Sequence, residues 1–323
     1  MTDAAMTPAD TAAKRLSAPK GAQLEPWFEY LCLAAATMLL AMLGGILVSL
    51  VIGGWPAFAK FGISFFVTSN WDPVAGVFGV AGLIVGTIVV ATLAMLMAVP
   101  LAFGAAFFLV ELCPSFLRRP IGTAVELLAG IPSIVFGMWG LFVFGPGFAK
   151  YVEMPIMNAA PPGSFWEKLT AGVPNGTGIL SASIIVAMMV LPFVAATLRE
   201  LLLTVPPQVR ESAYGLGATT GEVVMKVTLP YVRRGAIGAV MLGLGRALGE
   251  TMAVTFIIGN AHAFPKSLFD AGSTIASTIA NEFAEATTPL HTAALLASGL
   301  ILFVMSFAVL ALARLMLGRQ GNA

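Results

Sequence analysis

The chain has 323 residues, of which 58% are hydrophobic and 10% charged, and its formal net charge is +1. A soluble domain carries about 25% charged residues, so this composition excludes an ordinary soluble protein. The small net charge also provides no basic field that would attract nucleic acid. The apolar residues form long runs, without the short alternation of a membrane β-barrel. This pattern predicts a polytopic α-helical membrane protein.

Six runs are long enough to cross a bilayer, which takes about 20 apolar residues. They are Trp27–Gly53, Phe78–Leu112, Ile121–Phe148, Gly178–Leu198, Gly235–Ile258 and Leu290–Leu317. The second run has room for two short passes broken at Pro100, but no polar turn divides it, so we expect one helix. The sequence therefore predicts an all-α fold with six transmembrane helices in residues 27–317, flanked by tails 1–26 and 318–323.

Positive charges predict the orientation of these helices. If both termini are cytoplasmic, the cytoplasmic segments hold Lys14, Arg15, Lys20, Arg118, Arg119, Arg199, Arg210, Lys226, Arg233, Arg234, Arg314 and Arg319, and the external segments hold only Lys60, Lys150, Lys168 and Lys266. Lys and Arg are enriched in the cytoplasmic loops of membrane proteins. We therefore expect a multi-pass protein of the cytoplasmic membrane with both tails in the cytoplasm.

The cytoplasmic segment between the fourth and fifth runs, residues 207–232, has the pattern of a helical hairpin. Val209, Ala213 and Leu216 share one face of its first helix. Gly217 suits the left-handed residue that ends a helix. The segment therefore turns at Gly217.

The second helix of this hairpin has its own start and stop residues. Thr219 and Glu222 have the spacing of a capping box, which begins a helix. Three valines then form an apolar stripe: Val223, Val224 and Val227. Pro230 is expected to end the helix. Such an amphipathic hairpin either lies on the bilayer surface or docks on another protein, and local physics favours neither.

Two opposite charges stand inside the fifth apolar run. Arg246 and Glu250 are four residues apart, so in a continuous helix they share a face. Each charge costs about 2.5–3.5 kcal/mol to insert at the centre of a membrane helix, which calls for a reason. Either the pair is a structural salt bridge beside the small residues Gly245 and Gly249, or Arg246 binds an oxyanion in a pathway, or the pair opens and closes as a gate.

The hairpin resembles the signature of bacterial ABC importer permeases, which runs Glu-Ala-Ala, three residues, Gly, nine residues, Ile-x-Leu-Pro. Matching residues are Glu211, Ala213, Gly217, Leu229 and Pro230. Ser212 and Val227 depart from the signature by small or apolar replacements. The resemblance implies a type I importer permease whose hairpin seats on an ATPase subunit and carries its motion to the spans.

A wider resemblance points to one group within that family. Residues 243–260, 126–140 (ELLAGIPSIVFGMWG) and 281–285 (NEFAE) are similar to PstC-type permeases of the high-affinity phosphate importer. The resemblance implies phosphate transport by alternating access, with Arg246 and Glu250 taking part in phosphate passage. It also implies a PstA-type second permease, a dimeric PstB-type ATPase and an external PstS-type phosphate-binding protein. Permeases for molybdate or sulfate, or an ion-coupled secondary carrier, are the alternatives.

Catalytic and metal sites are not expected in this chain. It has no G-x-x-x-x-G-K-[ST] phosphate loop, so ATP and Mg belong to a separate ATPase subunit. His262 and His291 are isolated in sequence and are expected to be solvated, and no metal-ligand spacing surrounds them. Glu111 and Glu126 flank a loop with arginines and are expected to be ordinary interface charges, and Glu282 is a weak candidate for contact with a binding protein.

Overall fold

The computed structural model describes residues 25–319, all of them in helices, turns and loops. The predicted tails 1–26 and 318–323 lie outside the described residues except at their inner ends, where α2 begins at Glu25 and α16 ends at Arg319. The chain divides after Ile52 into two compact units.

The first unit is formed by the N-terminal part of one long helix, α2 (Glu25–Phe61). The predicted first span, Trp27–Gly53, is confirmed as helix. It continues beyond its predicted end, through Pro56 to Phe61, with Lys60 in its last turn.

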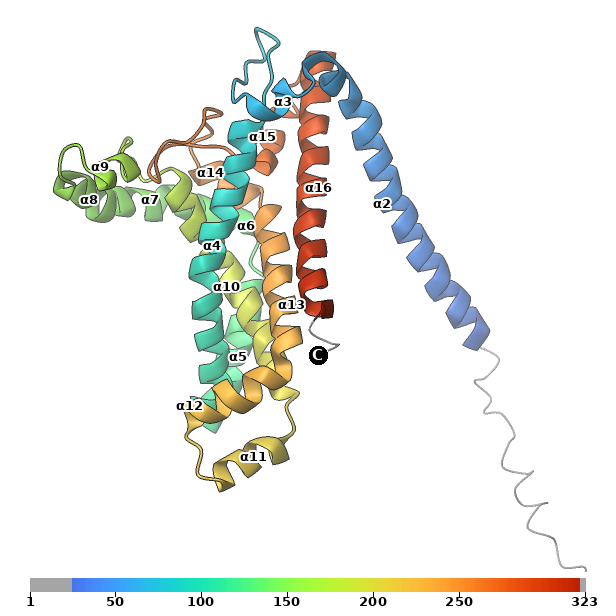
Figure 1. The fold of residues 1–323 in the computed structure, drawn as a ribbon, viewed down its shortest axis with the longest axis vertical. Helices are drawn as coiled ribbons and strands as arrows, with labels where there is room; N and C mark the ends of the chain where they lie inside the picture. The colour runs from blue at the N-terminus through green and yellow to red at the C-terminus, as the bar shows by residue number, and fades with distance from the viewer. Residues whose placement is uncertain (1–24, 320–323) are drawn as a thin grey trace, which may run out of the picture. The chain divides into compact units, whose positions relative to one another are not determined.

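The second unit contains the end of α2 and every later element (Figure 1). In chain order they are α3 (Ser64–Val67), α4 (Ala81–Phe107), η1 (Phe108–Leu112), α5 (Ser115–Ala129), α6 (Ser133–Trp139), η2 (Gly140–Phe144), α7 (Gly145–Phe148), η3 (Ala149–Glu153), α8 (Met154–Ala159), α9 (Phe165–Leu169), α10 (Ile179–Leu203), α11 (Pro207–Gly215), α12 (Thr220–Glu222), η4 (Val223–Thr228), α13 (Leu229–Leu248), α14 (Met252–Ile257), α15 (Ile275–Glu282) and α16 (Pro289–Arg319). The four η segments are π-helical turns that continue neighbouring α-helices.

Five helices of the described residues are long and apolar enough to cross a membrane. They are Trp27–Phe61, Ala81–Leu112, Ser133–Ala159, Ile179–Leu203 and Pro289–Leu312. The second confirms that residues 78–112 hold one helix, which runs unbroken through Pro100. The predicted fourth and sixth spans are likewise confirmed as α10 and α16. The total of six crossings stays a prediction.

The third predicted span, Ile121–Phe148, is wrong as a single helix. It is interrupted at residues 130–132, where Pro132 has no N–H to donate and forces Ile131 out of the helical conformation. The chain before the interruption is α5. The chain after it is helical from α6 to the end of α8, beyond the predicted boundary, and runs across the direction of α4 and α10 in Figure 1.

The fifth predicted span, Gly235–Ile258, is also not one helix. Its first part belongs to α13, which begins earlier, at Leu229, and ends at Leu248. The chain leaves the helix over residues 249–251 and resumes as the short α14. Gly249 favours this interruption because glycine is a poor helix former, and Glu250 accepts a hydrogen bond from the helix that follows.

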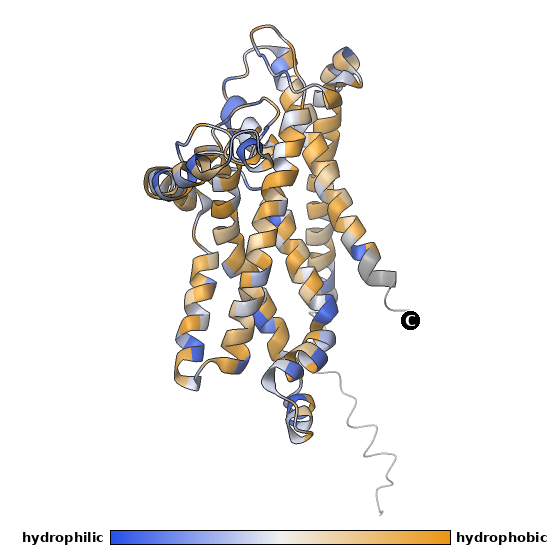
Figure 2. Ribbon diagram, turned by 60° about the vertical axis from the view of Figure 1, so that its left-hand side comes forward, coloured by the Kyte–Doolittle hydropathy of each residue, from blue (hydrophilic) through white to orange (hydrophobic). Residues whose placement is uncertain are grey.

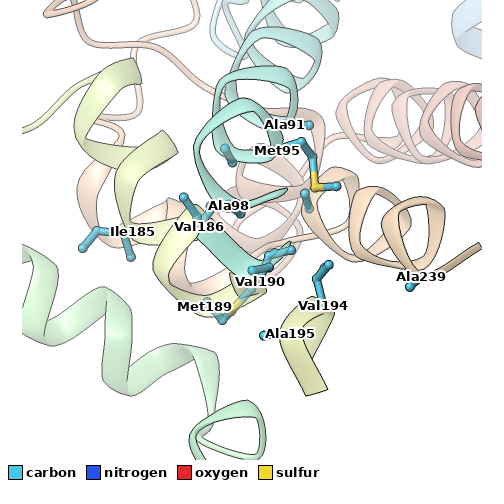
Figure 3. Packing of buried hydrophobic residues seen from close by; sticks show 14 of the residues in the cluster. Ala91, Met95, Ala98, Ile185, Val186, Met189, Val190, Val194, Ala195 and Ala239 are labelled. Atoms are coloured by element: carbon cyan, nitrogen blue, oxygen red, sulfur yellow. The ribbon is translucent and has the colours of Figure 1, made fainter. Parts of the chain in front are cut away.

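The main core lies where α4 packs against α10. Alanines at helical spacing line the buried face of α4: Ala91, Ala94, Ala98, Ala102 and Ala106. They face larger residues of α10, including Val186, Met189 and Val190, and Ala239 of α13 joins the same cluster (Figure 3). Small side chains let helix backbones approach closely, which is how membrane helices associate without a hydrophobic driving force.

A second core, built from residues of α3, α4, α15 and α16 and of the segment before α4, lies at the other end of α4. The loop that follows α14 crosses the same end of this helix. Gly82 and Gly86 form a smooth strip on α4, and this loop crosses it. A Cβ atom on Gly82 would lie 2.6 Å from the carbonyl oxygen of His262, and one on Gly86 would overlap the carbonyl oxygen of Ser273. The hydroxyl of Thr87 on α4 accepts a hydrogen bond of 3.0 Å from the backbone N–H of Ile275. The loop therefore packs directly against the backbone of α4.

Replacing Gly86 with alanine should therefore destabilise the protein although alanine is the better helix former. Overpacking of this kind costs about 1–3 kcal/mol. The matched control is Gly104→Ala in the same helix, where the space around the glycine is open and the change should be neutral or stabilising. Thermal unfolding of both variants in detergent measures the difference. Equal midpoints would contradict the close packing of loop and helix.

Candidate functional site

The first helix of the hairpin predicted to be cytoplasmic, α11, ends in a Schellman motif. The backbone N–H of Ala218 donates to the carbonyl of Ala213 at 3.2 Å, and that of Gly217 donates to Tyr214 at 2.9 Å. Gly217 has φ +88°, the left-handed region that glycine adopts without strain. The predicted turn at Gly217 is confirmed.

The predicted capping box at the start of the second helix is confirmed as well. The backbone N–H of Glu222 donates to the Thr219 hydroxyl at 3.4 Å, and the N–H of Thr219 donates to the Glu222 carboxylate at 3.1 Å. The Lys226 ammonium, 2.9 Å from Glu222, and the Thr219 N–H together lower the pKa of this carboxyl to about 2. Glu222 therefore keeps its charge and its cap at any physiological pH.

The prediction that Pro230 ends the second helix is wrong. The helix runs without interruption from Thr220 through η4 and α13 to Leu248. Proline clashes with the carbonyl four residues before it and donates no hydrogen bond. The π-helical turn η4 (Val223–Thr228) precedes Pro230 and takes up this mismatch by widening the helix. The second arm of the hairpin and α13 therefore form one helix.

The two apolar stripes of the hairpin have different surroundings. Val223 and Val224 are buried and Val227 is half-buried, so the stripe of the second arm packs within the chain. On α11, by contrast, Leu216 is 89% exposed and Val209 is also exposed. Figure 2 shows hydrophilic residues gathered around this end of the molecule. The second arm of the hairpin is therefore packed within the chain, whereas the first arm is exposed to solvent.

Arg246 and Glu250 are not neighbours on one helix face. Arg246 lies in the last turn of α13, whereas Glu250 lies beyond its end. No ion pair within 4.0 Å joins them in the part of the chain that the structure describes. The prediction of a shared face and the interpretation as a structural salt bridge are both wrong for this conformation, because the helix ends between the two residues.

Glu250 instead caps the next helix. Its carboxylate accepts a hydrogen bond of 3.3 Å from the backbone N–H of Ala253 in the first turn of α14. The residue is buried, with 8% of its surface exposed. A capping carboxylate satisfies backbone groups that the interruption of the helix leaves free. Glu250 therefore stabilises the break at residues 249–251.

Arg246 has an aromatic partner rather than an acidic one. Its guanidinium carbon lies 5.6 Å from the centre of the Phe193 ring on α10. Its Nε is buried and has no hydrogen-bond partner among the described residues. Cation–π contact stabilises an arginine without neutralising its charge. The Arg246 side chain is therefore held in place by Phe193, while its Nε–H remains free to donate a hydrogen bond. No pattern in the sequence distinguishes Phe193 from the other phenylalanines, of which the chain has 22 in all.

A largely buried polar cluster joins segments that the sequence predicts to be external, and its members were not expected to meet. The carboxylate of Glu282, at the end of α15, accepts from the indole N–H of Trp71 at 2.7 Å. It also contacts Nε2 of His262 at 2.8 Å and Nε2 of His291 at 2.7 Å. The rings of Trp71 and His262 stack. We call these four residues the external clasp. Trp71 lies 211 positions before Glu282 in the sequence, whereas the other three residues lie within residues 262–291.

The external clasp corrects the expectation that both histidines are solvated, since His291 is buried and His262 only partly exposed. Burial raises the pKa of Glu282, but hydrogen bonds from His262, Trp71 and His291 outweigh it, so its pKa lies below the ordinary value of 4.5. Glu282 uses its oxygens within the chain and is not a free contact for a binding protein. No group of metal-ligating residues large enough for a metal ion occurs in residues 25–319.

Comparison with known proteins gives a consistent result across the chain. Residues 98–319 match the family described as "Binding-protein-dependent transport system inner membrane component". The "Phosphate transport system permease protein PstC" of Mesorhizobium japonicum is 52% identical over 88% of this chain and 88% of its own. The protein of the same name from Haemophilus influenzae is 48% identical over 92% of this chain and 94% of its own.

Solved structures resemble the fold. A chain of a bacterial alginate ABC transporter, crystallised with an alginate pentasaccharide-bound periplasmic protein, matches 94% of this chain with a TM-score of 0.61 and 17% identity, over 99% of its own length. A chain of the MetNI methionine ABC transporter in an inward-facing conformation matches 74% of this chain, and 94% of its own, with a TM-score of 0.55 and 15% identity. At these identities the likeness concerns the fold alone.

Replacing Glu282 with glutamine should destabilise the external clasp, since hydrogen bonds to charged groups contribute about 1.5–3 kcal/mol. Because the pKa of Glu282 is lowered on folding, its contribution is fully present above pH 4.5 and is lost as the pH falls through the lower folded-state value. The gap in melting temperature between the unaltered protein and Glu282→Gln should therefore shrink in acid. Glu285→Gln, an exposed neighbour, is the control. A gap that does not change with pH would exclude a carboxylate role.

Proposed function

The chain belongs to the family of binding-protein-dependent transport permeases and, within it, to the PstC group, and on this premise we propose that it is the phosphate-translocating permease subunit of an ATP-driven importer. The observation that carries the choice of phosphate is the 52% identity to a phosphate permease over 88% of both chains. The apolar helices make it a multi-pass protein of the inner membrane.

The energy for transport comes from another subunit. This sequence has no phosphate loop for ATP, and the chain is similar throughout to transport permeases. We infer that ATP and Mg bind a dimeric PstB-type ATPase on the cytoplasmic side. A PstA-type second permease completes the pathway, and a PstS-type protein delivers phosphate from outside. The excess of basic residues in alternate loops supports cytoplasmic termini.

The hairpin is the element that we assign to the ATPase. Its first arm presents Leu216 and the exposed Glu211 to solvent, while its second arm is packed within the chain. An amphipathic helix with an uncovered apolar face suits a groove on another protein. The anchored arm, through Leu229 and Pro230, leads directly into α13. A displacement of the docked arm therefore reaches the membrane helices.

Arg246 is the residue that we assign to the phosphate pathway. Its charge is not neutralised by an acidic partner among the described residues, and Phe193 holds it in place. A guanidinium presents donors in a planar fork that matches the oxygens of phosphate. A single arginine provides a weak site, which suits transport because a tight site would trap the anion.

Glu250 shapes the same region from within the helix break. Non-helical backbone within a membrane protein is tolerated where it is enclosed by protein or lines an aqueous cavity. Interrupted helices with free backbone groups form the substrate sites of many transporters. We therefore place the pathway beside residues 246–251. Pairing of Arg246 with Glu250 in another conformation would make the two residues a gate.

Replacing Arg246 with glutamine should lower phosphate uptake by tenfold or more, on the basis of about 1.5–3 kcal/mol for hydrogen bonds to a charged group. The measurement is uptake of radioactive phosphate into proteoliposomes that contain both permeases and the ATPase. Arg234→Gln is the matched control, because Arg234 is exposed on the same helix and should be dispensable.

Two outcomes would contradict the proposal. Normal uptake by the assembled Arg246→Gln complex would exclude both the pathway and the gate. Concentrative uptake by the unaltered permeases without any ATPase would indicate a secondary carrier. Uptake of sulfate or molybdate in place of phosphate, with the matching binding protein, would support an ATP-driven importer but contradict phosphate as its substrate.

Replacing Gly217 with valine should weaken docking of the ATPase or uncouple it from transport. Valine at φ +88° is strained by about 1–3 kcal/mol, so the turn between the two arms would change shape. Gly215→Val is the matched control, since Gly215 has an ordinary φ and open space around it. Co-purification and ATP-dependent uptake are measured together. If both are normal in Gly217→Val, the hairpin does not couple the subunits.

A further inference from the structure

One ion pair connects the cytoplasmic helix α11 to the end of α4. Nη1 of Arg210 lies 3.0 Å from Oε1 of Glu111. Arg210 belongs to α11, and Glu111 belongs to η1, which extends α4. The two residues are 99 positions apart in sequence. Glu111 was expected to be an ordinary interface charge beside Arg118 and Arg119, and it instead contacts the hairpin.

This pair is enclosed, unlike the other ion pair of the hairpin. The side chain of Glu111 is 10% exposed and that of Arg210 is 19% exposed. Lys226 and Glu222, by contrast, are 72% and 45% exposed. Exposed pairs contribute little to stability, whereas removing one partner of an enclosed pair leaves an uncompensated charge. The geometry therefore resists separation of Arg210 from Glu111.

The pair is also the only side-chain link of its kind from α11. Among the residues that the structure describes, every other hydrogen bond or ion pair of a side chain in Pro207–Gly215 is local to that helix. The backbone joins α11 to α10 and to α12 through short loops. Figure 1 shows α11 beyond the ends of α4 and α5. The ion pair therefore adds a side-chain connection from α11 to the end of α4, beside the two loops and the packing of α11 against η4.

Glu111 lies at the turn that connects α4 to α5, so a displacement of its side chain acts on both helices. It lies in the last turn before Cys113 and Pro114, where the chain reverses from α4 into α5. α5 is in turn linked to α10 by the ion pair of Arg199 with Glu126, 2.7 Å apart. A pull on Glu111 therefore acts on α4 and α5 together, and through them on α10.

We propose that Arg210 and Glu111 form a tie that transmits displacement of the docked hairpin to α4 and α5, in addition to the path through α13. The tie rests on the proposed function, in which α11 seats on the ATPase. Arg210 and Glu111 are positioning residues, because they touch neither phosphate nor ATP. Their contribution is to coupling, meaning the phosphate transported for each ATP hydrolysed.

The test compares single and exchanged charges in the reconstituted complex. Arg210→Glu and Glu111→Arg should each lower the ratio of phosphate uptake to ATP hydrolysis by about fivefold or more, the lower range for coupling between sites. The double variant, in which the two charges change places, should recover much of that loss. Arg119→Glu, which reverses an exposed charge on α5 outside the hairpin and the tie, is the control and should leave the ratio unchanged.

Each result decides the matter. Single variants with the ratio of the unaltered complex would overturn the tie, as would an exchanged variant that hydrolyses ATP but recovers no coupling. If a charge-reversed variant does not assemble, the neutral variant Arg210→Gln, which removes the ion pair, should still show a lowered ratio, and a normal ratio would overturn the tie. Absence of ATP-driven uptake in the unaltered complex would instead refute the proposed function.

Discussion

The close packing of α4 against α10 is the interaction on which the rest of the described molecule depends. In a bilayer, apolar helices gain little by leaving lipid, so their contact rests on how closely the backbones approach. The fully buried alanines Ala94, Ala98 and Ala102 allow that approach. The pair then carries, at different heights, the ring of Phe193 that holds Arg246 and the carboxylate of Glu111 that holds α11. Both contacts are therefore held by the same packed pair of helices.

Features that depend on neighbouring residues could be predicted from the sequence. The long apolar runs that became α4, α10 and α16 are evident from composition. The capping box of Thr219 and Glu222 and the left-handed turn at Gly217 follow from spacings within one helical turn. The family signature at the hairpin identified the class of machine for the same reason, since it is a local pattern.

Features that depend on the folded environment could not be predicted. An apolar run of sufficient length hides a short interruption, as at residues 130–132 and 249–251, because its average hydropathy is unchanged. A proline ends a helix or is absorbed by it according to the packing around it, and η4 absorbs Pro230. The external clasp joins Trp71 to Glu282 across 211 positions. No spacing in the sequence could indicate that contact.

The unbroken helix from Thr220 to Leu248 has a mechanical consequence. At 1.5 Å per residue it is about 43 Å long, so it reaches from the hairpin to the neighbourhood of Arg246 as a single rod. A rod of that length converts a tilt of about 5° at one end into a shift of about 4 Å at the other. A small rotation of an attached ATPase would thus produce a larger displacement at the far end of this helix. The widened turn η4, before Pro230, is the place where the helix would bend.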